Sequence, residues 1–267
     1  MSKYTGQISK LISNLDSPIS YTLPIGENKV PLNNLIGKTV TFEFEGEIRC
    51  VECDSKIKKT FMQGYCYPCF ISSPKTSECI LKPELCRAHE GEARDMNWAE
   101  KHCLQDQYIY LSLTSNLKVG VTRHTQIPTR WIDQGAHYAL ILAKTPNRYL
   151  AGMIEKEISQ HISDRTYWRR MLLGEYPDLN LLEEKESLIK NLSSEYHKFI
   201  TTDEDVINLN YPILTKPEKI KSLNFDKIPQ ITGQLNGIKG QYLFLNNDSV
   251  LNIRKFTGYI INFNICS

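Results

Sequence analysis

Cysteine is the residue type whose spacing carries the clearest chemical signal in this chain. Seven of the eight cysteines lie between residues 50 and 103, and the eighth is Cys266. The first group consists of two Cys-x-x-Cys pairs separated by twelve residues: Cys50, Cys53, Cys66 and Cys69. Each pair can present two thiolates from a tight turn, and four thiolates form the tetrahedral cage in which proteins hold zinc. We therefore predict a zinc site, with a rubredoxin-like iron site or disulfides as the alternatives.

A second group of metal-ligating residue types follows directly. It comprises Cys79, Cys86, His89 and Cys103, and the Cys86–His89 spacing repeats that of the first pairs with an imidazole in the second place. We predict a second zinc site of three sulfurs and one nitrogen, with His102 as the substitute fourth ligand. The alternative is that Cys79 and Cys103 are buried free thiols. Both metals would be enclosed by protein ligands and would stabilise a segment that has few large apolar side chains.

Hydrophobic periodicity indicates the elements on either side of the cysteines. Ile8, Leu11, Ile12 and Leu15 have the spacing of one helical face and predict a short N-terminal helix. Segment 38–48 alternates between apolar and polar residues and predicts a half-buried strand. Gly- and Asn-rich turns separate four further predicted strands near the C-terminus, at 230–236, 241–246, 249–253 and 258–263. These short strands are expected to complete a small sheet or barrel, together with strand 38–48.

The middle of the chain mixes strands and helices. Segments 108–113 and 117–122 predict a β-hairpin whose turn is Thr114-Ser-Asn116. The elements predicted after the hairpin are a helix at 129–135, a buried strand at 139–142, and helices at 148–161 and 181–199.

Composition and charge bound the function classes. Hydrophobic residues make up 41% of the 267 residues and charged residues 23%, which excludes a disordered, collagen-like or coiled-coil protein. No apolar run approaches the length that a bilayer requires, and the first fifteen residues lack the apolar core of an export signal, so we expect a cytoplasmic protein. The net charge is +2, yet segment 118–170 alone carries +5 and leaves −3 elsewhere. This local excess favours an anionic partner such as nucleic acid.

The hairpin and the two helices after it carry a recognisable order of residues. Tyr110 is on the first strand and Gly120 on the second, and Arg130 and Glu155 follow on the helices at 129–135 and 148–161. This order resembles the GIY-YIG nuclease superfamily, although Lys118 stands where a second tyrosine is usual. The resemblance implies phosphodiester hydrolysis, in which Glu155 binds Mg²⁺, Arg130 holds a phosphate oxygen and Tyr110 deprotonates water.

A second resemblance extends over most of residues 50–263. In this range the chain resembles a family of uncharacterised bacterial proteins. The resemblance rests on the cysteine groups together with three motifs: Lys118-Val-Gly-Val-Thr-Arg123, Pro128-Thr-Arg-Trp-Ile-Asp-Gln-Gly-Ala136 and Gly237-Ile-Lys-Gly-Gln-Tyr-Leu243. That resemblance implies no settled activity.

Each candidate catalytic residue also has a structural interpretation. Tyr110 could be an ordinary strand aromatic, Arg130 could pair with Asp133, and Glu155 could lie on a solvated helix face. Trp131 and Trp168 are interpreted as core residues rather than as platforms for stacked bases.

These observations predict an α+β protein with four parts. The parts are an N-terminal helix and strand at 1–49, a zinc-ribbon-like cysteine-rich segment at 50–107, a GIY-YIG-like α/β core at 108–202 and a β-rich segment at 203–267. We predict a zinc-stabilised protein that binds DNA or structured RNA, with nucleic-acid contacts from Lys118, Arg123, Arg169 and Arg170. Three hypotheses stay open: a Mg²⁺-dependent endonuclease, a module that binds without cutting, and a structural zinc protein that binds other proteins.

Overall fold

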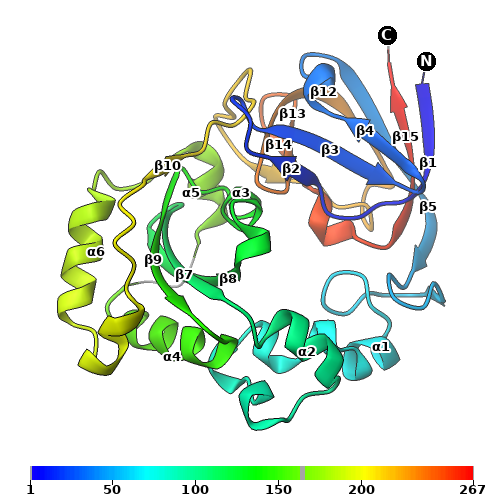
Figure 1. Cartoon of the computed structure of the whole chain (residues 1–267). Helices are drawn as coiled ribbons and strands as arrows, with labels where there is room; N and C mark the ends of the chain where they lie inside the picture. The colour runs from blue at the N-terminus through cyan, green and yellow to red at the C-terminus, as the bar shows by residue number, and fades with distance from the viewer. Residues whose placement is uncertain (1, 163–165, 267) are drawn as a thin grey trace. The chain divides into compact units, whose positions relative to one another are not determined.

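The chain forms two compact units, which Figure 1 shows in a computed structural model that describes residues 2–162 and 166–266. Unit 1 comprises the residues up to Ile71 together with those from Asn210 onward, and unit 2 comprises Ser72–Leu209. The predicted α+β class is confirmed, because three sheets and several helices are present. The two units divide the cysteine-rich segment 50–107: its first cysteine group belongs to unit 1 and its second to unit 2.

Unit 1 is built on an eight-stranded sheet with the order β1-β15-β5-β12-β13-β14-β11, in which β6 also pairs with β5. Its strands are β1 (Ser2–Gln7), β5 (Thr39–Arg49), β6 (Lys56–Ile57), β11 (Lys221–Ser222), β12 (Gln230–Lys239), β13 (Tyr242–Leu245), β14 (Ser249–Asn252) and β15 (Tyr259–Ile265). A three-stranded sheet contains β2 (Ile12–Asn14), β3 (Ser20–Ile25) and β4 (Asn28–Pro31). Of the strands predicted near the C-terminus, β12 and β15 therefore pair directly with β5, the strand predicted at 38–48, and β13 and β14 continue the sheet beyond β12.

Aromatic side chains fill much of the core of unit 1. The rings of Phe42 on β5 and Phe263 on β15 lie 4.6 Å apart between centroids, and both side chains are fully buried. Phe225 packs edge-on against Phe256 at 4.7 Å. Because the two ends of the chain contribute adjacent strands, this core forms only when segments more than 200 residues apart meet.

The predicted N-terminal helix is wrong. The segment forms strands β1 and β2, and β1 pairs with β15 along its whole length. Ile8 and Leu11 are fully buried, whereas Ile12 and Leu15 are more than 40% exposed. The spacing that suggested a helical face therefore does not correspond to one buried face. The bridge from Ile8 to Ile25 and the pairing of β2 with β3 override the local pattern.

Unit 2 contains a four-stranded antiparallel sheet with the order β10-β9-β7-β8. Its strands are β7 (Gln107–Leu113), β8 (Leu117–Arg123), β9 (Tyr138–Thr145) and β10 (Ile207–Asn208). The α-helices of the chain are α1 (Tyr67–Ser72), α2 (Met96–His102), α3 (Thr129–Asp133), α4 (Arg148–Ile158), α5 (Trp168–Leu173) and α6 (Leu181–Lys190). The predicted hairpin is confirmed by the pairing of β7 with β8.

Short 3-10 helices connect these elements. They are η1 (Asn33–Leu35), η2 (Pro74–Thr76), η3 (Glu78–Ile80), η4 (Pro83–Leu85), η5 (Ala88–Glu90), η6 (His124–Gln126), η7 (Ser194–Phe199) and η8 (Ile253–Phe256). The helix predicted at 181–199 is interrupted, since α6 ends at Lys190 and η7 follows. The backbone N–H and hydroxyl of Ser193 both donate to Glu157 on α4, which provides partners that a continuous helix would not use.

The two faces of the unit 2 sheet have different roles. Ile109, Leu111 and Val119 point to one face and pack with apolar residues of α4 and α6 in one hydrophobic cluster. Tyr110 on β7 pairs with Gly120 on β8, and both residues lie on the other face. The sheet therefore holds its candidate site residues on the face that is not covered by α4 and α6.

Candidate metal centres and cationic pocket

The first cysteine group forms a compact set of four sulfurs in unit 1. The sulfurs of Cys50, Cys53, Cys66 and Cys69 all lie within 4.8 Å of one another. Backbone N–H groups point at them: Cys66 donates to the Sγ of Cys50 at 3.2 Å, and Cys69 donates to the Sγ of Cys66 at 3.4 Å. Four converging sulfurs with amide donors match the donor set of a tetrahedral metal–thiolate site. This cluster can therefore hold a metal ion, and its chemistry is compatible with zinc.

The backbone of this first cluster requires glycine at position 64. Gly64 has φ of +114°, and a Cβ there would lie 2.7 Å from Cγ1 of Val51. The carbonyl of Gly64 accepts the N–H of Val51 at 2.9 Å, which ties the two cysteine pairs together. Gly64 therefore allows the turn of the second cysteine pair to pack against that of the first.

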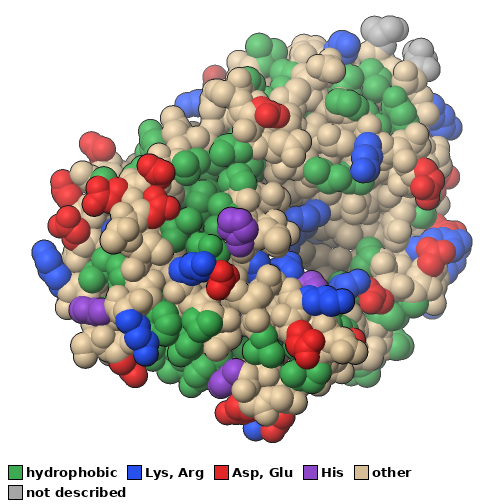
Figure 2. Space-filling view, in the orientation of Figure 1, with side chains coloured by type: hydrophobic (Ala, Val, Ile, Leu, Met, Phe, Trp, Pro, Cys, Tyr) green, Lys and Arg blue, Asp and Glu red, His purple; other side chains and the backbone are tan. Residues whose placement is uncertain are grey.

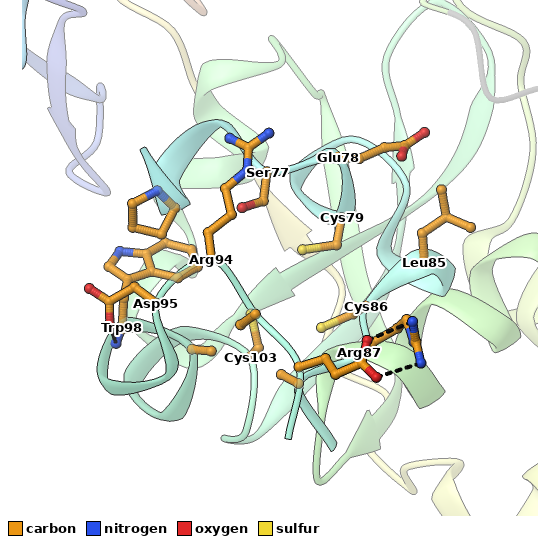
Figure 3. Close-up of a pocket in the computed structure, with 15 residues that line it drawn as sticks. Ser77, Glu78, Cys79, Leu85, Cys86, Arg87, Arg94, Asp95, Trp98 and Cys103 are labelled. Carbon is orange, nitrogen blue, oxygen red and sulfur yellow. Dashed lines mark hydrogen bonds and ion pairs between the residues drawn. The ribbon is translucent and has the colours of Figure 1, made fainter. Parts of the chain in front are cut away.

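The second cluster in unit 2 contains three sulfurs rather than four ligands. The Sγ atoms of Cys79, Cys86 and Cys103 lie within 4.8 Å of one another. His89, the predicted fourth ligand, lies outside this group, and its ring stacks on Tyr149 with centroids 4.4 Å apart. Figure 3 shows the three cysteines around the wall of a pocket. The cluster can hold a metal ion, but the structure does not bring His89 to it.

The substitute ligand His102 is also turned away from the three sulfurs. Its ring stacks almost parallel on Trp98 at 4.1 Å, and its Nδ1 lies 2.8 Å from the carbonyl oxygen of Trp98. Burial lowers the pKa of His102, which favours the neutral ring.

Arg148 connects the second cluster to helix α4. Its backbone N–H donates to the carbonyl of Cys103 at 2.8 Å, and its guanidinium donates to the carbonyls of Cys79 and His102 at 3.3 and 3.2 Å. Gly152, one turn further along α4, packs so closely on η4 that a Cβ there would overlap the backbone of Glu84. The loop that carries the cysteines is therefore fastened to the helix that carries Glu155.

Tyr110, Gly120 and Arg130 come together as the sequence order suggested. Tyr110 is fully buried opposite Gly120, where a Cβ would lie 2.5 Å from the tyrosine Oη. The phenol hydrogen-bonds with the guanidinium of Arg130 and accepts the amide N–H of Gln134 at 2.9 Å. Burial raises the pKa of Tyr110 in spite of the Arg130 charge, so the phenol stays protonated.

Glu155 lies within the electrostatic reach of the same group. Burial raises the pKa of this half-buried carboxyl to about 7, and the charge of Glu84 also raises it. The charges of Lys118 and Arg130 and a backbone hydrogen bond from Val121 act in the opposite direction. Because the N–H of Val121 belongs to the edge strand β8, it is available to the carboxylate. Glu155 is therefore not on a solvated helix face, and its ionisation falls near neutral pH.

A cationic pocket of about 410 Å³ opens next to these residues. Its lining residues in unit 2 are Lys75, Ile80, Pro83, Trp98, His102, Gln107, Val121, Thr122, Arg123, Gln126, Arg130 and Arg148. Four of these are Lys or Arg, and none of the described lining residues is Asp or Glu. Burial and the Arg148 charge lower the pKa of Arg123. On the face in Figure 2, by contrast, Lys and Arg side chains are interspersed with Asp and Glu.

The remaining predicted nucleic-acid residues lie elsewhere. Arg169 and Arg170 are exposed on α5, where the Arg169 guanidinium lies over Trp168 and Arg170 pairs with Glu175 at 3.5 Å. Neither residue lines the cationic pocket, so the predicted basic stretch does not form one site. Trp131 is buried and packs on Tyr110, as expected for a core residue.

Sequence reasoning missed three contributors to this region. Gln134 lies four residues after Arg130 on α3, so the helical repeat could have indicated it. Lys75 and Arg148 enter the cationic pocket from segments far apart in the chain, and no local pattern indicated them.

The molecule so described is a mixed α+β protein with two cysteine clusters that can hold metal ions. Residues 37–261 match the family described as "Protein of unknown function (DUF2797)", and the chain belongs to this family. Neither the curated proteins nor the solved structures contain a significant match. In the described part of the chain, no helix has the length and apolar character needed to cross a bilayer.

Proposed function

We propose that unit 2 binds nucleic acid by accepting backbone phosphates in the cationic pocket. The observation that carries this proposal is the lining of the pocket, which combines Lys75, Arg123, Arg130 and Arg148 with no acidic residue in the described set. Phosphate contacts supply most of the affinity of proteins for DNA and RNA, and arginine is well suited to hold two phosphate oxygens at once.

The electrostatics of the pocket support an anionic ligand. Arg148 is only 8% exposed, and in the part of the chain that the structure describes its Nε has no hydrogen-bond partner. The nearby Arg123 is also partly buried, and the two positive charges oppose each other. Like charges out of water are costly unless an anion compensates them. A phosphate group in the pocket would lower this cost.

Zinc is the metal that we propose for the first cluster. Four cysteine thiolates in a tetrahedral arrangement suit zinc, and such a site leaves no position for a substrate. The metal would stabilise the turns around Cys50 and Cys66 and would take no part in a reaction.

A second candidate function is Mg²⁺-dependent cleavage of the bound phosphodiester, and Glu155 favours it. A carboxyl with a pKa of about 7 beside Arg130 has the properties of a group that moves protons or binds metal in an active site. Glu155 and the neighbouring Glu84 would hold the ion, which supplies charge stabilisation to the leaving oxygen. Arg130 would bind a phosphate oxygen.

The role that the resemblance implied for Tyr110 changes in this proposal. A fully buried phenol with a raised pKa is a poor base for water. Through its hydrogen bond, Tyr110 would instead act as a positioning residue that orients the guanidinium of Arg130 toward the pocket.

The binding proposal is tested by fluorescence anisotropy with labelled DNA duplexes and RNA hairpins over a range of salt concentrations. Arg123→Ala should weaken binding and reduce the log–log salt slope by about 0.7 to 0.9, the value for one lost phosphate contact. The matched control is Arg169→Ala, which removes an arginine outside the pocket. Equal effects of the two variants, or no salt-dependent binding by the wild type, would reject the proposal.

Cleavage is tested separately with Glu155→Gln, which keeps the shape and removes the charge. Binding should persist or tighten in this variant, whereas any Mg²⁺- or Mn²⁺-dependent cutting should fall by several orders of magnitude. Binding by the wild type without cutting would support the non-catalytic module. Failure of both assays would favour the third hypothesis, a zinc protein with protein partners.

A further inference from the structure

We propose that the second cysteine cluster holds its metal with three thiolates only and that the open fourth position binds a small thiol from the adjacent cavity. This inference is independent of nucleic-acid binding, since the cavity is distinct from the cationic pocket.

The first support is the position of the three sulfurs at a cavity wall. Cys79, Cys86 and Cys103 all line a cavity of about 470 Å³. Figure 3 shows their side chains at this wall, with Arg94 and Trp98 also around the cavity. The four-sulfur cluster of unit 1, in contrast, is complete within its own turns. A metal bound by the three sulfurs would therefore face a space large enough for a small molecule.

The second support is that both candidate histidines are engaged elsewhere. His89 stacks on Tyr149, which belongs to the first turn of α4, and His89 is not among the residues that line the cavity. His102 stacks on Trp98 and lines the cationic pocket instead. To reach the metal, each ring would have to give up its aromatic contact.

The acidic residues at the cavity also have other partners. Glu92 pairs with Arg87 at 2.6 Å, Asp95 accepts the N–H of Trp98 at 3.0 Å as the N-cap of α2, and Glu78 lies 3.9 Å from Lys82. Among the described residues, no carboxylate oxygen lies within 4.8 Å of all three sulfurs. The protein thus supplies three ligands, which is the number found where a metal keeps one position for an exogenous ligand.

The chemistry of the site selects the ligand class. Thiolate ligands favour soft metals such as zinc, and a fourth sulfur completes the same donor set that the first cluster obtains from its own chain. Pro74, Leu85 and Trp98 supply apolar walls, and Arg94 adds a positive charge at the cavity. A compact thiol, neutral or bearing a carboxylate, fits these surroundings.

The test uses the full chain loaded with Co²⁺ in thiol-free buffer and titrated with 2-mercaptoethanol. Cobalt reports its ligands through visible absorption, and the closed four-sulfur cluster contributes nothing to the difference spectrum. We expect a saturable change that corresponds to one thiol bound per chain. Cys79→Ser should abolish the change, whereas Cys266→Ser, which removes a cysteine outside both clusters, should retain it.

The decisive comparison is with the predicted histidine ligand. His89→Ala and His102→Ala should each retain both metals and show the same half-saturation concentration as the wild type. The proposal is overturned if either variant loses one metal, if the wild type shows no thiol-dependent change, or if the thiol simply removes the cobalt.

Discussion

The two cysteine clusters differ in the number of sulfurs that they bring together and in the elements to which they are fastened. The cluster of unit 1 gathers four sulfurs from two adjacent turns and is tied to the end of strand β5, where Arg49 donates its N–H to Gly258 at 2.8 Å. The cluster of unit 2 gathers three sulfurs from η3 and from the ends of η4 and α2, and Arg148 bonds it to helix α4. Under the proposals above, the first cluster is a closed structural site, and the second is coupled to the candidate functional site through α4.

Because of this difference, we expect the structural effect of losing each metal to reach a different part of the molecule. The first cluster contacts turns and a small group of aromatic rings that includes Phe61 and Phe70, 5.9 Å apart. The second cluster bonds to α4, which also carries Glu155. Disturbing the second cluster should therefore change the electrostatics of the candidate site, whereas disturbing the first should not.

The largest expected effect comes from Cys66→Ser. Structural zinc contributes about 10–16 kcal/mol of apparent binding free energy in small peptides, and loss of one thiolate removes much of it. Metal content measured by elemental analysis should fall by one ion per chain, and the folded unit 2 should remain.

Cys86→Ser is the matched variant for the other cluster. It should also lose one ion, but it should in addition weaken the salt-dependent nucleic-acid binding, because the metal would no longer hold in place the loop whose Cys79 and His102 carbonyls bind Arg148. Identical binding by the two variants would contradict the comparison between the clusters.

Gly152→Ala should produce the next largest effect, because the new Cβ would overlap the backbone of Glu84 where η4 packs on α4. A gain in helix propensity of about 1 kcal/mol would be exceeded by an overpacking cost of about 2–3 kcal/mol. Urea unfolding measures the net loss. The control is Gly91→Ala, at a φ of +83° with nothing within 4 Å, which should cost about 1 kcal/mol from backbone strain alone.

The pH dependence of stability should differ in sign between the two units. The pKa of Glu155 is raised from 4.5 to about 7, so its folded state holds the proton more tightly than the unfolded state. Stability from this group is complete below pH 4.5 and is lost as the pH rises through 7, by at most roughly 3 kcal/mol. Glu155→Gln should remove this loss and stabilise the protein at pH 8.

Glu47 in unit 1 provides the opposite case. Hydrogen bonds from Lys56 and Arg49 lower the pKa of its carboxyl, so its stabilising contribution is present at neutral pH and is lost on acidification. The unfolding temperatures of Glu47→Gln and Glu155→Gln, measured between pH 4 and pH 8, should show opposite pH dependences relative to the wild type. A Glu155→Gln profile parallel to that of the wild type would show that Glu155 titrates normally.

The smallest effect is expected from Arg170→Ala. This arginine is exposed, and its 3.5 Å pair with Glu175 is a surface ion pair. Such pairs contribute about 0–1 kcal/mol, so both the unfolding free energy and the salt slope should stay near the wild-type values. A large loss of nucleic-acid affinity would mean that the α5 surface, rather than the cationic pocket, is the binding site.

Several elements could be predicted from local patterns because local physics determines them. Alternation predicted the strand at 38–48 and the hairpin of β7 and β8, and those strands are present within a residue or two. The helical spacing at residues 8–15 misled, because Ile8 bridges to Ile25 and β2 pairs with β3, and the spacing by itself does not show these pairings.

The sequence by itself determined the four-sulfur cluster, since two Cys-x-x-Cys turns bring their own ligands and need only to meet each other. It also determined the order of Tyr110, Gly120, Arg130 and Glu155. The tertiary structure alone decided that His89 stacks on Tyr149 away from the sulfurs, that Lys75 and Arg148 share a pocket with Arg130, and that Glu155 titrates near neutral pH. Desolvation and charge–charge energies depend on every atom packed around a group, and in this fold those atoms come from segments that no spacing rule connects.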